Sequence, residues 1–436
     1  MLCWDKTMLC DNIEVRNNRL YFAGRDTVEL AEKYSTPVYL FDEQRIRANM
    51  RLYIDSMAKH FKSARALYAS KAMSCKRIYE LAREEGMGVD VVSLGELAYV
   101  KAAGFPLENV WFHGNAKTDA DISTAMDWGI GGFVADSYEE LYAIDAMAGE
   151  RGIKQNVLLR VTPGIDPHTF EAVNTGKLDS KFGVPIETGQ AEDYVAAAMG
   201  CRNLNILGLH AHVGSQVFDS QVFYDTADIM IAFLGKLRES LGFEAELLNL
   251  GGGYGVRYKD SDPFVDIDHE LSTVAEHIEK RCAEFGIKEP CILMEPGRSI
   301  VADAGMTLYT VQNVRSIKDH HSYVAIDGGM GDNPRFALYG SEYTVIKANG
   351  AEEAAAGVFN VVGRFCESGD VIQENVPLPE CRRGDIIAVC TTGAYNHTMA
   401  SNYNAVARPP VVMIDGEKDY YAVRRETLED LLRREM

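Results

Sequence analysis

The chain has 436 residues, of which 47% are hydrophobic and 25% are charged, as in large globular proteins and unlike disordered, collagen-like or coiled-coil chains. This length favours one large domain joined to a second one. The 44 Lys and Arg residues stand against 64 Asp and Glu residues, so the formal net charge is −20. Because the chain also lacks a basic run, nucleic acid is not expected as a partner.

The cysteines and the apolar segments indicate the compartment. Nine cysteines form no CxxC pair and no metal-ligand spacing, which favours free thiols, a cytoplasmic protein and no metal site. The sequence contains no apolar stretch of about eighteen residues, and the opening MLCWDKTMLCDN lacks the apolar core of a signal peptide. We therefore expect neither secretion nor insertion in a membrane.

The N-terminal segment reads as a β-hairpin. Residues 13–24 (IEVRNNRLYFAG) would turn at Asn17–Asn18, a pair that tolerates the left-handed backbone of a tight turn. This hairpin precedes the repeat described next and does not share its pattern. We expect it to join a C-terminal β domain, which would then be discontinuous, with predicted boundaries of 1–36 and 304–436 around a barrel at 37–303.

Short apolar runs alternate with helix-like stretches from Ala64 to about Gly297. Ser93 with Glu96, and Ser137 with Glu140, are capping-box pairs that predict helix starts. The apolar runs, which predict eight strands, are 65–70, 88–92, 110–114, 131–136, 156–161, 206–214, 246–253 and 291–297. Eight buried strands alternating with helices predict an α/β fold, a (β/α)8 TIM barrel with its active site at the carboxyl ends of the strands.

After Ala304 the pattern changes to β runs without long helices. The predicted strands are 306–314, 323–329, 358–363, 385–391, 409–414 and 419–425. Residues 424–436 are expected to form a charged terminal helix. The sequence therefore predicts a second, all-β domain.

Polar residues gather where the barrel strands end. Lys71 follows the first strand, where neighbouring groups could make its amine nucleophilic, although a solvated lysine at a helix start is the commoner case. His210 and His212 follow the sixth strand on one face. Two histidines at this spacing could ligate a metal, but no matching ligand set accompanies them. A ring that covers a cofactor explains them better.

The last two strands end in a glycine cluster and a charged pair. Gly251, Gly252 and Gly253 could bring backbone N–H groups close to an anion, although a tight turn explains such a cluster about as well. Their position favours phosphate, because TIM barrels commonly bind phosphate after strands seven and eight. Glu295 and Arg298 are either an ion pair or contacts to one ligand. Together with Lys71, these groups suit pyridoxal 5′-phosphate.

At these residues the sequence resembles the fold-type III, alanine-racemase-like family of pyridoxal-phosphate-dependent decarboxylases, and within it the members that act on diaminopimelate. The resemblance covers nearly the whole chain. Its motifs are YASKA (68–72), DVVSLGEL (90–97), FHGNAK (112–117), TPGIDPHT (162–169), TGKLDSKFG (175–183), HAHVGSQ (210–216), LNLGGGYG (248–255), EPGRS (295–299), DGGMGDNPRFALYG (327–340), CESGD (366–370) and TGAYNHTMASNYN (392–404).

The resemblance implies roles for named residues around the cofactor. Lys71 would bind pyridoxal phosphate covalently, His212 would stack on its ring, and Glu295 would hold the pyridine nitrogen. Racemases of this fold have an arginine where Glu295 stands, so the carboxylate favours decarboxylation. The residues implied around the phosphate and the substrate are Ser215, Gly252, Gly253, Gly297, Arg298 and Tyr395.

The resemblance also implies substrate contacts and a dimer. Cys366 would be the proton donor, and Glu367 would meet the distal ammonium of the substrate. Both would reach the barrel of the opposite subunit, which implies a homodimer with shared active sites. Arg335 and Tyr339 would bind the distal carboxylate. The implied reaction converts meso-2,6-diaminopimelate, a small amino acid, to L-lysine and CO2, the last step of lysine biosynthesis.

Three positions depart from the family pattern: Leu94, Ala116 and Phe336. Leu94 and Ala116 affect only local loop geometry, whereas Phe336 lies beside Arg335 and leaves room for an altered substrate. Two alternatives therefore stay open. One is decarboxylation of another amino acid, such as ornithine, lysine or a carrier-bound glutamyl group. The other is a non-catalytic regulator that has kept the fold.

Overall fold

The computed structural model describes residues 10–165 and 180–436. The chain divides into two compact units, which we call the barrel unit (Met50–Gly255 and Val265–Gly297) and the β unit (Met1–Asn49, Val256–Phe264 and Arg298–Met436). The motifs at 162–169 and 175–183 lie partly outside the described residues. No helix in the described ranges is long and apolar enough to cross a membrane.

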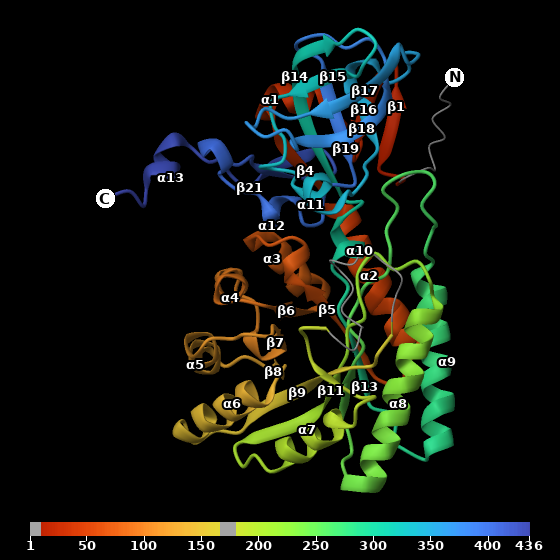
Figure 1. Cartoon of the computed structure of the whole chain (residues 1–436), viewed down its shortest axis with the longest axis vertical. Coiled ribbons are helices and arrows are strands. Elements are labelled where there is room, and N and C mark those ends of the chain that lie inside the picture. The colour runs from red at the N-terminus through yellow and green to blue at the C-terminus, as the bar shows by residue number, and fades with distance from the viewer. Residues whose placement is uncertain (1–9, 166–179) are drawn as a thin grey trace. The chain divides into compact units, whose positions relative to one another are not determined.

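The barrel unit contains all eight predicted strands. They are β5 (Ala64–Ala69), β6 (Gly88–Val91), β7 (Val110–Phe112), β8 (Gly132–Ala135), β9 (Gln155–Thr162), β11 (Leu204–His210), β12 (Leu247–Asn249) and β13 (Cys291–Met294). Each pairs with the next in parallel, and β13 pairs with β5, which closes the barrel. A short strand, β10 (Val184–Pro185), pairs with β9. The predicted TIM barrel is confirmed (Figure 1).

Helices cover the outside of the barrel. They are α3 (Lys76–Glu85), α4 (Leu94–Ala102), α5 (Asp119–Trp128), α6 (Tyr138–Glu150), α7 (Gln190–Met199), α8 (Gln221–Leu241) and α9 (Ile267–Phe285), while α2 (Glu43–His60) runs from the β unit into the barrel unit. Figure 1 shows α8 and α9 side by side as the two longest helices.

The predicted N-caps Ser93 and Ser137 are confirmed, since each hydroxyl accepts a bond from the N–H three residues on. The reciprocal half of each predicted capping box is wrong. The carboxylate of Glu96 accepts instead from the N–H of Val92, and that of Glu140 pairs with the buried Lys117 at 2.6 Å. Both carboxylates therefore meet donors on the barrel side of their helices.

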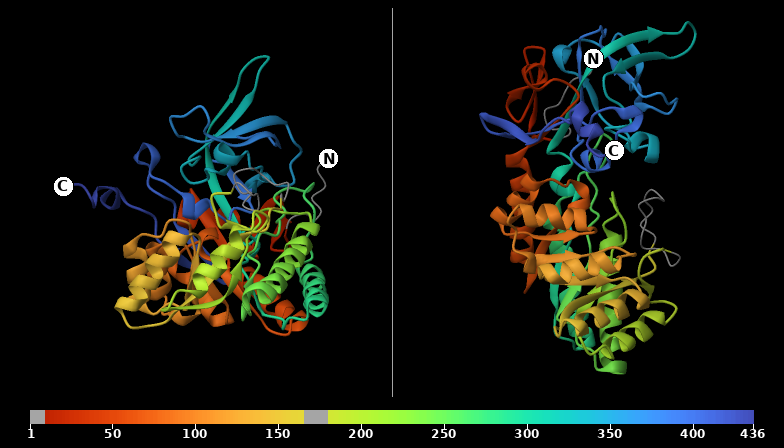
Figure 2. Two further views of the ribbon diagram at one scale, coloured as in Figure 1. Left: turned by 60° about the horizontal axis from the view of Figure 1, so that its bottom comes forward. Right: turned by 90° about the vertical axis from the view of Figure 1, so that its left-hand side faces the viewer.

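The β unit is built on one large sheet. Its strands are β4 (Val38–Asp42), β14 (Gly305–Ser316), β15 (Ser322–Ile326), β16 (Val345–Lys347), β17 (Gly357–Val362), β18 (Val371–Leu378), β19 (Ile386–Cys390), β20 (Val411–Asp415) and β21 (Lys418–Val423). The strand order is β18-β17-β15-β14-β4-β20-β21, with β19 joining β14 to β16. In Figure 2 the teal hairpin of β14 and β15 extends beyond the rest of the sheet.

The predicted hairpin is present as β1 (Ile13–Arg16) and β2 (Arg19–Phe22), and both asparagines of its turn have positive φ angles of 52° and 62°. A two-residue strand, β3 (Arg25–Asp26), completes its sheet. Leu20 and Phe22 pack in one buried cluster with Leu40 and Leu308 of the large sheet. Val38–Asp42, which the predicted boundary placed with the barrel, pairs in this sheet with β14 and β20.

The helices of the β unit are short. They are α1 (Thr27–Tyr34), α10 (Arg298–Val301), α11 (Arg335–Tyr339), α12 (Asn396–Met399) and α13 (Leu428–Leu432). The helix expected over residues 424–436 is therefore confined to five residues. Arg424 bonds to Asp430, and Thr427 caps the helix by accepting a bond from the N–H of Asp430. These contacts hold the charged segment before α13 in a turn.

Candidate active site

Lys71 lies in a single 3-10 turn, Ser70–Ala72, that begins directly where β5 ends. A hydrogen bond stabilises this turn, because the Tyr68 hydroxyl donates to the carbonyl of Met73 at 2.8 Å. Gly297 follows β13 beside it, and a Cβ there would stand 2.9 Å from the Cβ of Ala69 and 3.1 Å from that of Ala72. Only glycine at 297 lets these two strand ends approach, so Gly297 shapes the site through its missing side chain.

Glu295 is the buried anion at the centre of the barrel mouth. It is 8% exposed, and its Oε1 accepts from the amide of Asn249 at 2.6 Å. The Nε2 atoms of His113 and His210 lie 3.1 and 3.4 Å from its oxygens. These three residues follow or end β7, β11 and β12, so three barrel strands place their polar groups around one carboxylate.

Burial and the imidazoles set the charge of this group. Burial alone would raise the pKa of Glu295, but the adjacent His113 and His210 outweigh it and hold that pKa well below its ordinary value. Burial lowers the pKa of both histidines, and also that of His212. The interaction with the imidazoles therefore favours the ionised form of Glu295, whose oxygens accept hydrogen bonds from the groups around them.

His113, His210 and Glu295 also bring their ligand atoms within 4.8 Å of one another, a set that could hold a metal ion. The sequence did not reveal this set, because His113 belongs to a different strand from the histidine pair. The set includes Glu295, the carboxylate assigned to a pyridine nitrogen. A pyridinium N–H and a metal ion would thus compete for the same oxygens.

Asp90 and Glu96 add two acids that the sequence analysis did not assign to the site. Asp90, in β6, is 3% exposed, and its Oδ1 has no hydrogen-bond partner among the described residues. Burial and the charge of Glu295 hold the pKa of Asp90 well above its ordinary value. Burial also raises the pKa of Glu96 to about 7. Asp90 therefore holds its proton more strongly than an ordinary aspartic acid does.

The glycine cluster packs tightly against the ends of two other strands. A Cβ on Gly252 would stand 2.2 Å from the carbonyl oxygen of Glu295, and a Cβ on Gly253 would stand 2.1 Å from that of Gly214. The N–H of Gly252 points to Nδ1 of His212 at 3.4 Å. Ser215 follows Gly214 directly. Because these glycines carry no side chains, their backbone N–H groups can approach a ligand closely, as in phosphate-binding loops.

A second polar cluster lies within the β unit. The guanidinium carbon of Arg298 lies 4.8 Å from the centre of the Tyr395 ring, and that of Arg335 lies 5.4 Å from it. Tyr258 bridges them, since its hydroxyl accepts from Nη1 of Arg298 at 2.7 Å and its ring centre is 5.7 Å from the guanidinium carbon of Arg335. Tyr339 is 5.9 Å from Arg335. Four predicted site residues thus meet here, with Tyr258, which the sequence did not single out.

Arg335 is a buried cation whose hydrogen bonds are incomplete. It is 6% exposed, and its Nη2 donates to Ser341 at 3.2 Å. Its Nε and Nη1 have no hydrogen-bond partner within residues 10–165 and 180–436. Buried donors without partners cost stability unless a ligand satisfies them. The geometry therefore fits a site for a carboxylate.

Cys366 and Glu367 lie on the exposed loop between β17 and β18. The backbone N–H of Cys366 donates to the side chain of Asn404 at 2.8 Å, and the Glu367 carboxylate accepts from the Tyr403 hydroxyl at 3.1 Å. These partners are not members of the arginine cluster. Within the β unit, Cys366 and Glu367 therefore bond to other residues than those of the arginine cluster.

Comparisons with known proteins agree on one family. The family described as "Pyridoxal-dependent decarboxylase, pyridoxal binding domain" matches residues 45–302. A diaminopimelate decarboxylase from Halalkalibacterium halodurans is 41% identical over 417 residues, 96% of this chain and 95% of that protein. The Bacillus subtilis enzyme of that name is 39% identical over 418 residues, with coverage of 96% and 95%.

A solved structure leads to the same group. The diaminopimelate decarboxylase from M. jannaschii in co-complex with L-lysine has a TM-score of 0.89 and 32% identity, and the match covers 98% of each chain. Matches of this identity over nearly the full length show descent as well as fold. The chain belongs to the pyridoxal-dependent decarboxylases, in the group of the diaminopimelate decarboxylases.

Proposed function

We propose that this chain removes CO2 from meso-2,6-diaminopimelate and releases L-lysine, the last step of lysine biosynthesis. The observation that carries the substrate is Arg335, a buried guanidinium with two donors open among the described residues. A substrate that ended in a bare ammonium would leave these donors without an acceptor. A distal carboxylate would accept a charge-assisted hydrogen bond from this guanidinium.

The residues of the barrel mouth fit pyridoxal 5′-phosphate. Lys71 would hold it covalently, Ser215 and the glycine loop 251–253 would face its phosphate, and His212 would lie against its ring. Glu295 would accept a hydrogen bond from its ring nitrogen. When bound, the cofactor takes up the electron pair that the departing CO2 leaves behind.

Charge in the barrel mouth supports decarboxylation. Because the interactions with His113 and His210 favour the ionised form of Glu295, the site offers a carboxylate to a protonated ring nitrogen. The raised pKa of Asp90 disfavours a second negative charge beside Glu295. An arginine in place of Glu295 could not hold that nitrogen protonated, and the electron sink would weaken.

The proton that completes the reaction comes, in our proposal, from Cys366 of the opposite subunit. Its thiol protonates Cα of the product from the exposed loop after β17, and Glu367 meets the distal ammonium. Tyr395 and Arg298 would contact both the cofactor and the substrate. The active unit would accordingly be a homodimer with two shared sites.

We place the reaction in the cytoplasm. All eight cysteines within the described residues are free, which suits a reducing compartment. The ligand is a small amino acid, and the charge of −20 disfavours nucleic acid.

The decisive experiment identifies the product. The protein, loaded with pyridoxal phosphate, is incubated with meso-diaminopimelate, and lysine and CO2 are measured by mass. LL-diaminopimelate is the matched control, because it lacks the D-centre at which we expect attack. Ornithine, lysine and a carrier-bound glutamyl substrate form the rest of the panel. Faster turnover of one of these would assign another substrate, and no CO2 from any would indicate a regulator.

A further inference from the structure

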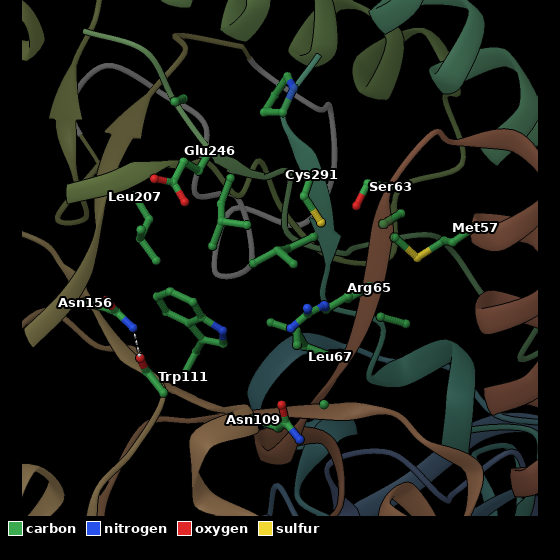
Figure 3. Close-up of a pocket in the computed structure, with 18 of the residues that line it drawn as sticks. Met57, Ser63, Arg65, Leu67, Asn109, Trp111, Asn156, Leu207, Glu246 and Cys291 are labelled. Carbon is green, nitrogen blue, oxygen red and sulfur yellow. Dashed lines mark hydrogen bonds between the residues drawn. The ribbon is translucent and has the colours of Figure 1, made fainter. Parts of the chain in front are cut away.

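A cavity of the barrel unit lies at the amino ends of the strands, the opposite end of the barrel from Lys71 and Glu295. It has a volume of about 1150 Å³ and is lined by the residues that begin the strands (Figure 3). Arg65 lies in β5, Asn109 directly precedes β7, and Asn156 lies in β9. None of the residues proposed above for the reaction lines it.

A buried layer forms the floor of this cavity. Leu67, Trp111, Leu158 and Leu293 pack together inside the barrel with at most 8% exposure. The Trp111 ring lies so close to β8 that a Cβ on Gly132 would stand 2.4 Å from its Cζ3 atom. The cavity therefore presents a rigid, apolar aromatic surface, and the layer separates it from the cofactor end of the barrel.

Arg65 brings a charge into this apolar end. It stands two residues before Leu67 in β5, and alternate residues of a strand share a face, so both point into the barrel. Figure 3 shows its guanidinium in the pocket with Trp111. No hydrogen bond or ion pair of this guanidinium is found in the part of the chain that the structure describes.

The other arginines of the lining are already engaged. Nη1 of Arg83 donates to the carbonyls of Ala103 and Gly104 at 2.8 and 3.0 Å. Arg238 donates to the carbonyl of Gly286 and lies 3.5 Å from Glu244. Arg65 thus differs from Arg83 and Arg238, because all of its guanidinium N–H groups can donate to a ligand.

The charges of the lining balance. The cations are Arg65, Arg83, Arg238 and Lys288, and the acids are Glu108, Glu244, Glu246 and Glu289. Such a lining has no excess positive charge for a polyphosphate or a dicarboxylate, whereas it tolerates one negative charge next to Arg65.

We propose that this pocket binds a small organic monocarboxylate with an apolar, planar body. The carboxylate accepts the forked bonds of Arg65, and the body lies on Trp111 and Leu67. The pocket thus combines an apolar face, formed by Trp111 and Leu67, with a guanidinium that can donate to a carboxylate. The site is independent of the proposed decarboxylation, because none of the residues proposed for that reaction lines it.

The probe is 3-phenylpropionate, titrated calorimetrically into the holoenzyme. Phenethylamine keeps the aromatic body and the chain but carries an ammonium, and phenyl phosphate carries a dianion. We expect phenethylamine to bind at least about tenfold more weakly, and phenyl phosphate to bind more weakly as well. Absence of 3-phenylpropionate binding, or equal binding of either control, would overturn the proposal.

Variants locate the bound probe. Arg65→Met should weaken 3-phenylpropionate at least about tenfold, and Arg65→Lys, which keeps the charge without the fork, should weaken it less. Arg238→Met is the matched control from the same lining and should change the dissociation constant less than about twofold. Arg335→Ala tests whether the probe binds instead at the site proposed for the distal carboxylate of the substrate. If Arg335→Ala abolished binding while Arg65→Met left it unchanged, the probe would sit in the reaction site and the proposal would fail.

Discussion

Arg335 lies with its guanidinium carbon 5.4 Å from the centre of the Tyr395 ring, so an aromatic face covers a buried cation that has no carboxylate partner in the described ranges. Aromatic faces stabilise a cation without neutralising it. A ligand carboxylate that reached Arg335 would therefore meet a full positive charge in a dry setting. This relationship makes Arg335 the residue that we expect to distinguish diaminopimelate from lysine.

Arg335→Ala should lower kcat/KM for meso-diaminopimelate by about thirtyfold to a thousandfold, the equivalent of about 2–4 kcal/mol for lost charge-assisted bonds. Turnover of lysine, which lacks the distal carboxylate, should change far less. The measurement is the ratio of the two kcat/KM values in wild type and variant. Arg383→Ala, an exposed arginine that bonds to the carbonyl of Gln312, is the control. An unchanged ratio would remove Arg335 from substrate recognition.

Lys71 should carry the cofactor. Borohydride reduction of the yellow holoenzyme should leave a pyridoxyl group on the peptide that contains Lys71, and Lys71→Ala should abolish turnover because the amine is lost. Lys76 begins the next helix and pairs with Glu80 at 3.5 Å on the surface, so Lys76→Ala should keep both adduct and activity. A pyridoxyl group on another lysine would refute the assignment.

Subunits that are inactive for different reasons should complement each other. Lys71→Ala removes a residue of the barrel unit and Cys366→Ala one of the β unit. Random exchange makes half of the dimers heterodimers, each with one intact shared site of two, so activity should recover to about a quarter of wild type. Mass spectrometry of the mixed dimers is the control for exchange. Heterodimers that form without activity would mean that both residues serve one chain's own site.

Gly253→Ala should weaken pyridoxal phosphate binding by more than about tenfold. Its φ angle of +127° is unfavourable for any residue with a Cβ, and the added atom would meet the Gly214 carbonyl oxygen at 2.1 Å. The loop must then move away from the place where the phosphate is expected. Rebinding of the cofactor to the apoenzyme, followed by visible absorbance, gives the dissociation constant.

Gly95→Ala is the control for that loop. Gly95 lies in α4, and the nearest atom to an added Cβ is the Ser93 hydroxyl at 3.6 Å. This variant should bind the cofactor as wild type does and gain a little helix stability. Equal cofactor affinity in both variants would show that the Gly253 backbone does not form the phosphate site.

The barrel could be read from the sequence because each strand is a short apolar run that ends in small or polar residues. The β unit was harder to predict. Val38–Asp42 is also an apolar run, but its partners β14 and β20 lie more than 250 residues away in the chain, and no local signal names them. β18 was missed because Gln373, Glu374 and Asn375 interrupt its apolar pattern.

The residues of the site likewise fall into two groups, those that the sequence identified and those that it did not. Lys71 and Glu295 were found because they stand at strand ends within recognisable motifs. Asp90 and Asn249 were missed because each is one polar residue in a strand that is otherwise apolar. Their roles come from proximity to Glu295, which only the closed barrel creates.

Asp332 should make the stability of the β unit depend on pH. It is 3% exposed, its Oδ1 accepts from the Tyr309 hydroxyl at 2.5 Å, and its Oδ2 accepts from the N–H of Gly329 at 3.0 Å. Burial, with the nearby acids Asp370 and Asp327, raises the pKa of Asp332 from 3.8 to about 7. The folded state therefore holds a proton that the unfolded state releases between these two values.

The stability that this proton contributes is complete below about pH 4 and is lost as the pH rises through about 7, because there the folded chain must ionise a buried acid. Asp332→Asn cannot ionise, but its NH2 group replaces one of the two oxygens that accept from Tyr309 and Gly329. We therefore expect the variant to be less stable than wild type at about pH 5, and the difference in stability to narrow, or reverse, by about pH 8.

Tm is measured by calorimetry at fixed protein concentration. Asp319→Asn, on the exposed loop after β14, should keep the wild-type profile. Parallel Tm profiles for wild type and Asp332→Asn would mean that Asp332 is ionised in the folded protein throughout this range.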